Sequence, residues 1–162
     1  MPIPAKSSVE ILTASLISMS TPDYLPEQLK TGVCEFNQGD FYACHDTLEA
    51  AWMEAENAEK PFYQGILQIA VAFYHLGNLN WRGGAILLGE GISRLRKFEP
   101  SHQGIAVEAL VDDSVEWLGL VQAAGPDGLA EIMSDLPRSL PQITWASASL
   151  SPSATETGPR TD

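Results

Sequence analysis

The chain has 162 residues, a hydrophobic content of 44% and a formal net charge of −12 at pH 7. This length and apolar content suffice for one domain with its own core. The acidic balance argues against direct nucleic-acid binding, which needs a basic face. The apolar stretch 65–76 is too short to span a bilayer, so we expect no membrane association. The two cysteines, Cys34 and Cys44, form no Cys-x-x-Cys pair and fit buried free thiols.

The first third of the chain predicts two helices separated by a proline-containing break. An apolar pattern after a capping box predicts a short helix over Val9–Met19. Because an acidic residue interrupts this run and no basic segment precedes it, we expect a cytoplasmic protein without a signal peptide. Pro26 fits the first turn of a second helix that ends at about Phe36, with Gly39 as its left-handed cap.

The middle of the chain predicts the two helices that carry most of the polar residues of interest. Asp40 is the expected N-cap of a helix over about Phe41 to Asn57. Pro61 starts another helix, which ends near Leu79 and is apolar almost all round. Such a helix is typical of the buried centre of a bundle.

The second half of the chain predicts two more helices and a change of composition. A helix from Trp81 to about Phe98 contains several glycines, which indicates close approach to the central helix. Another runs from about Gln103 to Ala124 and ends at Gly125-Pro126. We therefore expect an all-α, single-domain helical bundle of about five helices with a central apolar helix. The expected division is 1–22 N-terminal helix or arm, 23–136 helical core, and 137–162 extended and then disordered tail.

Polar side chains recur at helical spacing on the two middle helices. His45 and Glu49 lie four residues apart, with Trp52 three further on, so they share a face. If the next helix packs antiparallel against this one, its own polar stripe meets that face. The predicted ligand-binding residues of this buried polar seam are His45, Glu49, Trp52, Gln64, Gln68, His75 and Asn78.

Three interpretations of this seam stand side by side. It can be a structural hydrogen-bond network, since buried polar groups need partners. It can be a metal site with His45, Glu49 and His75 as ligands and Asp46 close by, although the repeated Glu-x-x-His of di-iron bundles is absent. It can also serve acid–base catalysis, with Glu49 tuning His45.

The ordered motifs also resemble a known family. They read Phe36-Asn37-x-Gly39-x-Phe41, His45-Asp46-x-x-Glu49-x-x-Trp52, Gln64-Gly65-Ile66-x-Gln68-x-Ala70, His75, Asn78 and Gly84-Ala85. Over about Leu25 to Leu95 this set resembles the domain of unknown function 309 family. The resemblance implies a small all-helical domain without an established activity and brings no catalytic residues. The family usually has His-Glu where this chain has His45-Asp46, and the shorter side chain reaches less far.

The sequence therefore predicts a helical module whose seam binds a small molecule or a protein partner, both unidentified. The alternative is a metal-dependent hydrolase-like enzyme that uses His45, Glu49 and His75. A homo-oligomer that pairs through the face with Gly83 and Gly84 is a further option. The sequence identifies no cofactor.

Overall fold

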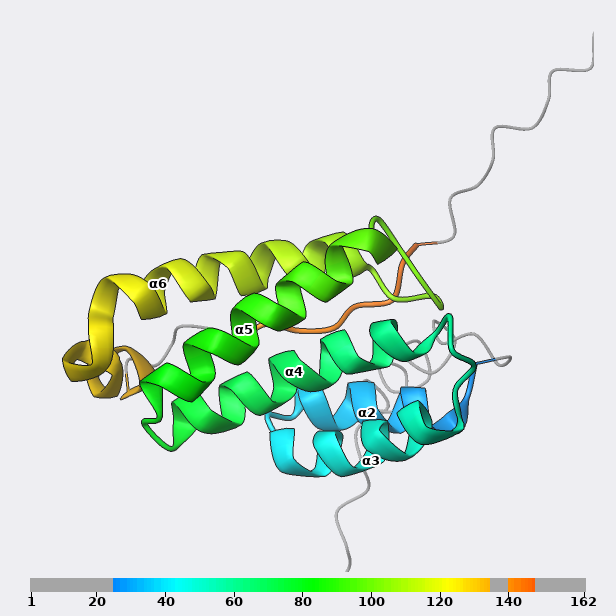
Figure 1. The fold of residues 1–162 in the computed structure, drawn as a ribbon, viewed down its shortest axis with the longest axis horizontal. Helices are drawn as coiled ribbons and strands as arrows, with labels where there is room; N and C mark the ends of the chain where they lie inside the picture. The colour runs from blue at the N-terminus through cyan, green and yellow to red at the C-terminus, as the bar shows by residue number, and fades with distance from the viewer. Residues whose placement is uncertain (1–24, 135–139, 148–162) are drawn as a thin grey trace, which may run out of the picture.

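The computed structural model describes residues 25–134 and 140–147, and these form a helical bundle (Figure 1). The helices are α2 (Glu27–Asn37), α3 (Phe41–Glu54), α4 (Lys60–Gly77), α5 (Trp81–Leu95) and α6 (Val107–Ser134), with a 3-10 turn η1 (Arg96–Phe98). They confirm the predicted all-α fold of about five helices. The helix predicted over Val9–Met19 lies outside the described residues. Of the described helices, none has an apolar stretch long enough to cross a bilayer.

Local signals set the starts of α3 and α5 as the sequence predicted. The Asp40 carboxylate accepts a hydrogen bond of 3.2 Å from the Ala43 N–H at the start of α3. The Asn80 side chain accepts one of 3.0 Å from the Gly83 N–H at the start of α5. Each cap satisfies an N–H that has no partner within its own helix. Gly39, between α2 and α3, has a φ of 78°, where glycine carries no steric penalty.

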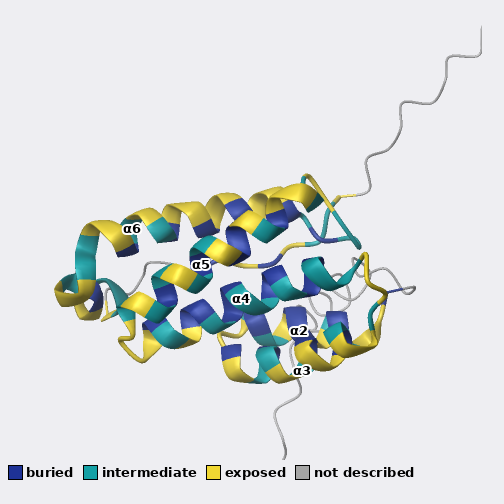
Figure 2. Ribbon diagram, in the orientation of Figure 1, coloured by how far each residue is buried: buried dark blue, intermediate teal, exposed yellow. Residues whose placement is uncertain are grey.

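Helix α4 is the centre of the bundle, flanked by α3 and α5 (Figure 1). Its buried residues are Phe62, Tyr63, Gly65, Ile66, Ile69, Ala70, Ala72, Phe73 and Leu76. The remaining stripe of α4 is half-buried or exposed, so α4 is not enclosed on every side (Figure 2). This stripe carries the polar residues that we expected to be buried.

Glycines allow α4 and α5 to approach each other closely. A Cβ added to Gly91 would lie 2.7 Å from Cγ1 of Ile69 and 2.9 Å from the Gly65 carbonyl oxygen. Gly84 likewise faces Leu76, so this glycine is already covered within the chain. The close approach is as predicted. Gly84 is buried and Gly83 is half-buried, and the oligomer suggested through this face stays a prediction.

Several predicted boundaries need correction or refinement. Helix α3 ends at Glu54 rather than at about Asn57, and α4 ends at Gly77 rather than near Leu79. Helix α6 begins at Val107 rather than at Gln103, because His102 and Ile105 bridge each other in a tight turn. The backbone of that turn requires a positive φ at Gln103 (45°). The expected end at Gly125 is present as a break inside α6, where Gly125 has a φ of 67° and Pro126 follows.

The cysteines differ from each other. Cys44 is fully buried in the core face of α3, as expected. Cys34 is exposed, contrary to expectation, because the core face of α2 is formed by Leu29, Val33 and Phe36 and Cys34 points away from it.

The segment 140–147 is extended and lies along the helices (the orange strand behind α5 in Figure 1). Ile143 is buried, and the Thr144 carbonyl accepts a hydrogen bond of 2.9 Å from the Ala106 N–H. Trp145 pairs with Ile105 in an isolated bridge. These contacts attach the segment to the start of α6. The division of the chain into arm, core and tail stays a prediction, since 1–24 and 148–162 lie outside the described residues.

Candidate functional site

The polar residues predicted on α3 lie at the surface, which corrects the expectation of a buried seam. His45 directly follows the buried Cys44, and Glu49 directly follows the buried Leu48. One residue corresponds to about 100° around a helix, so this stripe points beside the core rather than into it. Glu49 is exposed, and His45 and Trp52 are half-buried.

The residues predicted on α4 are also at the surface, and they do not form one network with α3. Gln64, Gln68 and His75 are half-buried, and Asn78 is exposed. Gln68 turns to α5, where its side chain bonds Glu90 and Arg94, each at 2.9 Å. The seam is therefore divided between two neighbours of α4, because α4 lies between α3 and α5.

Trp52 serves as a packing residue. Its ring lies against the core, with Nζ of Lys60 4.8 Å from the ring centroid. The indole Nε1 is buried and has no hydrogen-bond partner among the described residues. Trp52 thus packs near the connection between α3 and α4. It lines neither the hollow between α3 and α4 nor the hollow beside it.

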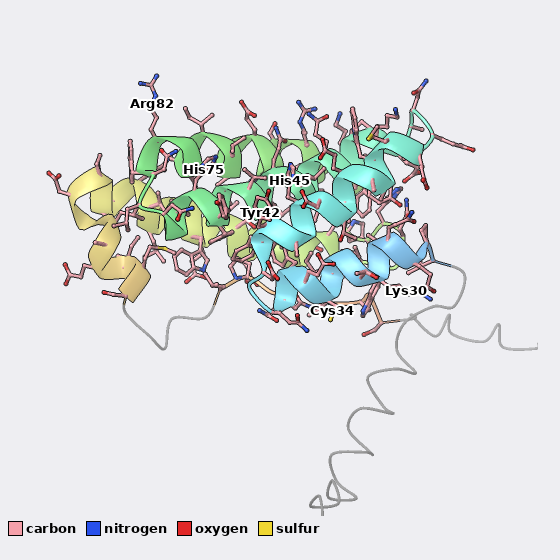
Figure 3. The ribbon with its side chains drawn as sticks, turned by 90° about the horizontal axis from the view of Figure 1, so that it is seen from below. Lys30, Cys34, Tyr42, His45, His75 and Arg82 are labelled. Carbon is pink, nitrogen blue, oxygen red and sulfur yellow. The ribbon has the colours of Figure 1, made fainter. Side chains whose placement is uncertain are left out.

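His45 and His75, in contrast, come together. They line a hollow of about 150 Å³ between α3 and α4, together with Phe41, Tyr42, Val71 and Tyr74. Figure 3 shows Tyr42 and His45 of α3 on the same face as His75 of α4. His45 Nδ1 lies 3.2 Å from Asp46 Oδ1, and His75 Nδ1 lies 3.3 Å from Nδ2 of Asn80. This meeting of the two histidines is the part of the predicted seam that the fold assembles.

Two tyrosines that the sequence did not single out as site residues dominate this hollow. The rings of Tyr42 and Tyr74 have centroids 5.8 Å apart and planes inclined by 50°. Tyr42 is 61% exposed and Tyr74 is 42% exposed. The packing of α3 on α4 brings Tyr74 opposite Tyr42.

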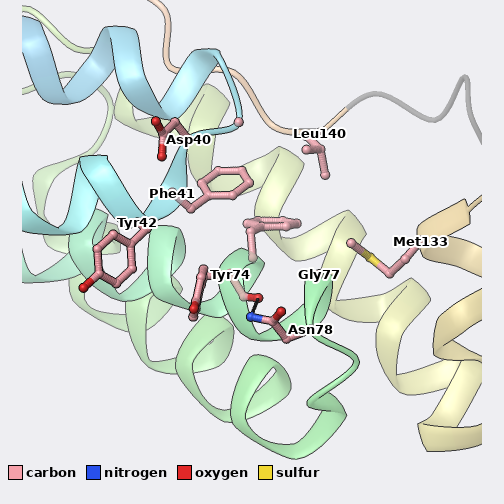
Figure 4. A pocket seen from close by; sticks show the side chains of 10 residues that line it. Asp40, Phe41, Tyr42, Tyr74, Gly77, Asn78, Met133 and Leu140 are labelled. Carbon is pink, nitrogen blue, oxygen red and sulfur yellow. Dashed lines mark hydrogen bonds between the residues drawn. The ribbon is translucent and has the colours of Figure 1, made fainter.

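A second hollow of about 380 Å³ adjoins the first and shares Phe41, Tyr42 and Tyr74 with it (Figure 4). The remaining lining residues are Gly39, Asp40, Phe73, Gly77, Asn78, Met133 and Leu140. In Figure 4 the dashed line marks the 3.2 Å hydrogen bond from the Asn78 side chain to the Tyr74 carbonyl. We call the two adjoining hollows the tyrosine groove.

The surroundings of the tyrosine groove are acidic. Helix α3 contains no Lys or Arg but carries Asp46, Glu49 and Glu54, and its N-cap is Asp40. The only Lys or Arg of α4 is Lys60, its first residue, at the opposite end from Tyr74. A cation that approaches the groove therefore meets carboxylates and aromatic faces, and no Lys or Arg of the described residues lines either hollow.

One group in the described part of the chain has metal-ligand chemistry. The ligand atoms of His45, Asp46 and Glu49 lie within 4.8 Å of one another. The group thus contains Asp46, while His75, which we expected as a ligand, is not in it. Imidazole and carboxylate together suit zinc, iron or manganese. Both carboxylates are exposed, so the group is open to solvent.

A separate polar cluster joins the start of α4 to the turn before α6, and the sequence did not indicate it. The Glu59 carboxylate accepts hydrogen bonds from His102 Nε2 (2.6 Å) and Gln103 Nε2 (2.7 Å). His102 packs between Phe62 and Phe98. Burial raises the pKa of Glu59, but the two hydrogen bonds and the His102 charge outweigh it and hold the pKa below its ordinary value. This cluster fixes the turn and adjoins neither hollow of the tyrosine groove.

The comparison with known proteins agrees with the sequence motifs. Residues 29–87 match a family described as "Domain of unknown function (DUF309)". The chain is thus similar to the DUF309 family over these residues. The match confirms the predicted resemblance, and it includes every residue that lines the smaller hollow of the groove.

Two curated relatives are described as uncharacterized. An "Uncharacterized protein" of Aquifex aeolicus is 28% identical over 104 residues, which is 64% of this chain and 31% of the relative. The "Uncharacterized protein YpuF" of Bacillus subtilis is 34% identical over 85 residues, 52% of this chain and 46% of that protein. The chain thus spans less than half the length of these relatives. No solved structure matches the chain significantly.

Proposed function

We propose that this chain is a protein-interaction module whose tyrosine groove binds a Lys or Arg side chain of a partner protein. The observation that supports this most is the Tyr42–Tyr74 pair, which leaves two large aromatic rings exposed over one hollow. Aromatic side chains exposed in this way are typical of interaction surfaces, because they offer a large contact area and a polar tip.

The chemistry of the groove favours a cationic group. The faces of tyrosine rings carry negative charge density and attract ammonium and guanidinium groups. Asp46 and Glu49 follow directly along α3 and add attraction of the same sign. Within the described residues, no Lys or Arg lines either hollow.

The size of the smaller hollow favours the end of a protein side chain over a large cofactor. Small-molecule pockets commonly measure about 300–1,000 Å³. The hollow between the two histidines has only about 150 Å³ and suits the end of one side chain. The adjoining hollow of about 380 Å³ offers room for the flanking residues of the partner.

The test is a titration of the protein with N-acetyl-arginine amide, followed by NMR of the histidine and tyrosine ring signals. We expect saturable shifts of the His45, His75 and Tyr42 signals in the wild type. Tyr74→Ala should abolish them, whereas Tyr74→Phe should retain most of the affinity because it keeps the aromatic face. Equal affinity of wild type and Tyr74→Ala, or no saturable shift in the wild type, would contradict the proposal.

A metal-dependent, hydrolase-like activity is the second candidate, since His45, Asp46 and Glu49 are close enough to share an ion. A divalent ion held there would supply Lewis-acid chemistry and an activated water. Its test is a titration of untagged protein with Zn²⁺ or Mn²⁺ by calorimetry. One ion per chain in the wild type and none in a folded His45→Ala variant would support it. No binding by the wild type would rule this candidate out.

A further inference from the structure

A third hollow lies on α5, the other neighbour of α4, and is lined mainly by charged residues. It has about 370 Å³ and is lined by Glu90, Ser93, Arg94 and Lys97. These positions are spaced by three, one and three residues, so they form one stripe on α5 and the 3-10 turn that follows it. This hollow has no lining residue in common with the tyrosine groove.

The hollow concentrates positive charge in an acidic chain. Of the Lys and Arg residues in the described part, three fall within four positions, at Arg94, Arg96 and Lys97. Basic residues at a helix C-terminus complement the helix dipole, which explains their sign. The dipole does not explain the arrangement of their hydrogen bonds.

Gln68 of α4 forms hydrogen bonds with both Arg94 and Glu90. Its amide oxygen accepts the Arg94 Nε–H at 2.9 Å, and its amide nitrogen donates to Glu90 Oε2 at 2.9 Å. Among the described residues, neither Arg94 nor Lys97 forms an ion pair. The guanidinium is thus held in place through Nε, while both of its terminal nitrogens remain available.

From this geometry we propose that Ser93, Arg94 and Lys97 bind the phosphate group of a small phosphate monoester. A planar guanidinium donates two parallel hydrogen bonds to a phosphate, and an ammonium and a hydroxyl complete the set of donors. Glu90 lines the same hollow and offers a carboxylate oxygen to a hydroxyl group on the ester. The assigned ligand is therefore a hydroxyl-bearing phosphate ester.

The overall charge favours a small ligand over a polyanion. A net charge of −12 repels nucleic acid and anionic membrane surfaces, which contact a wide area. A small ester senses mainly the charges within about 8 Å, the screening length at physiological salt. The hollow itself is lined by two cationic side chains and one carboxylate.

The experiment is a titration of the full chain with glycerol 3-phosphate, followed by NMR at physiological salt, with inorganic phosphate and glycerol as parallel ligands. We expect saturable shifts at Ser93, Arg94 and Lys97, tighter for the ester than for inorganic phosphate, and none with glycerol. Arg94→Gln should weaken binding about tenfold or more. Lys97→Gln, at an exposed position that does not support the fold, should weaken it several-fold.

The matched control is Arg82→Gln, which removes the same charge from the other end of α5 and should leave the affinity unchanged. Gln68→Met tests positioning: it should weaken glycerol 3-phosphate binding although Gln68 does not line the hollow, because Arg94 can then pair with Glu90. The proposal is overturned if the wild type shows no saturable shift, or if Arg82→Gln weakens binding as much as Lys97→Gln. Equal affinity for inorganic phosphate and the ester would overturn the assignment of the ester.

Discussion

Asn37 at the end of α2 holds Ile143, 106 residues later in the chain, through two hydrogen bonds. Its side-chain amide nitrogen donates to the Ile143 carbonyl at 2.9 Å, and its amide oxygen accepts the Ile143 N–H at 2.7 Å. The Asn37 side chain thus bonds both backbone groups of Ile143, as the backbone of a paired strand would. It joins the extended segment to the end of α2, next to Gly39.

Removing this pair of bonds should loosen the extended segment. We expect Asn37→Ala to lower the free energy of unfolding by about 1–3 kcal/mol, because the Ile143 backbone loses two partners in a partly buried place. Asn37→Asp keeps only the hydrogen-bond acceptor, so its free energy of unfolding should lie between those of the wild type and Asn37→Ala. Urea unfolding measures the stability of both variants. An unchanged midpoint in Asn37→Ala would show that these two hydrogen bonds contribute no stability.

Two glycines of α5 should respond in opposite directions to alanine. Gly91→Ala should destabilise the fold by about 1–3 kcal/mol, because its Cβ would meet Ile69 and the Gly65 carbonyl. Gly89 has only Leu118 nearby, at 3.9 Å, so Gly89→Ala should stabilise by about 0.5–1 kcal/mol through helix propensity. Thermal and urea unfolding of both variants provide the comparison. Equal effects would mean that α4 and α5 are not in close contact.

The Glu59–His102 contact should make stability depend on pH. Because the pKa of Glu59 is lower in the folded chain, its contribution is complete above the ordinary pKa and is lost as pH falls through the lowered value. Glu59→Gln should therefore be less stable than wild type at pH 7, and the difference should shrink in acid. Glu56→Gln, at an exposed position nearby, is the control. If the stability difference between wild type and Glu59→Gln were as large at pH 2 as at pH 7, the charge of Glu59 would not be its cause.

The two thiols should differ in reactivity. Burial, together with the carboxylates of Glu35 and Asp40, raises the pKa of Cys44 to about 12. The thiolate is the reactive form, so Cys44 should resist iodoacetamide at pH 8 in the native protein. Cys34 is exposed and should react. Mass spectrometry should find one label per native chain and two after denaturation; two labels at equal rates in the native state would refute the buried position.

The predictable part of the fold came from local signals. Asp40 and Asn80 cap the helices they precede, and Gly125 interrupts α6, because capping and positive φ depend on a few neighbouring residues. The glycines of α5 correctly indicated a close helix contact, since few other reasons place several glycines in one helix.

The degree of burial of the polar residues could not be predicted from such local signals, and they lie at the surface rather than in the core. His45 and Glu49 on α3, and Gln64 and Gln68 on α4, recur at helical spacing, but spacing does not say which face meets a neighbour. In the fold, α4 turns Gln68 toward α5 and His75 toward α3. Tyr42 and Asn37 were missed because their partners lie far away in sequence, and only tertiary packing brings them together.

The central claim is that the tyrosine groove recognises positive charge. Its most direct test compares N-acetyl-arginine amide with N-acetyl-citrulline amide, which has nearly the same shape but no charge. We expect the His75 and Tyr42 NMR signals to saturate with the arginine probe and to show at least about tenfold weaker binding of citrulline, as charge–aromatic contacts and nearby carboxylates imply. Equal affinities, or saturable shifts located away from the groove, would contradict the account.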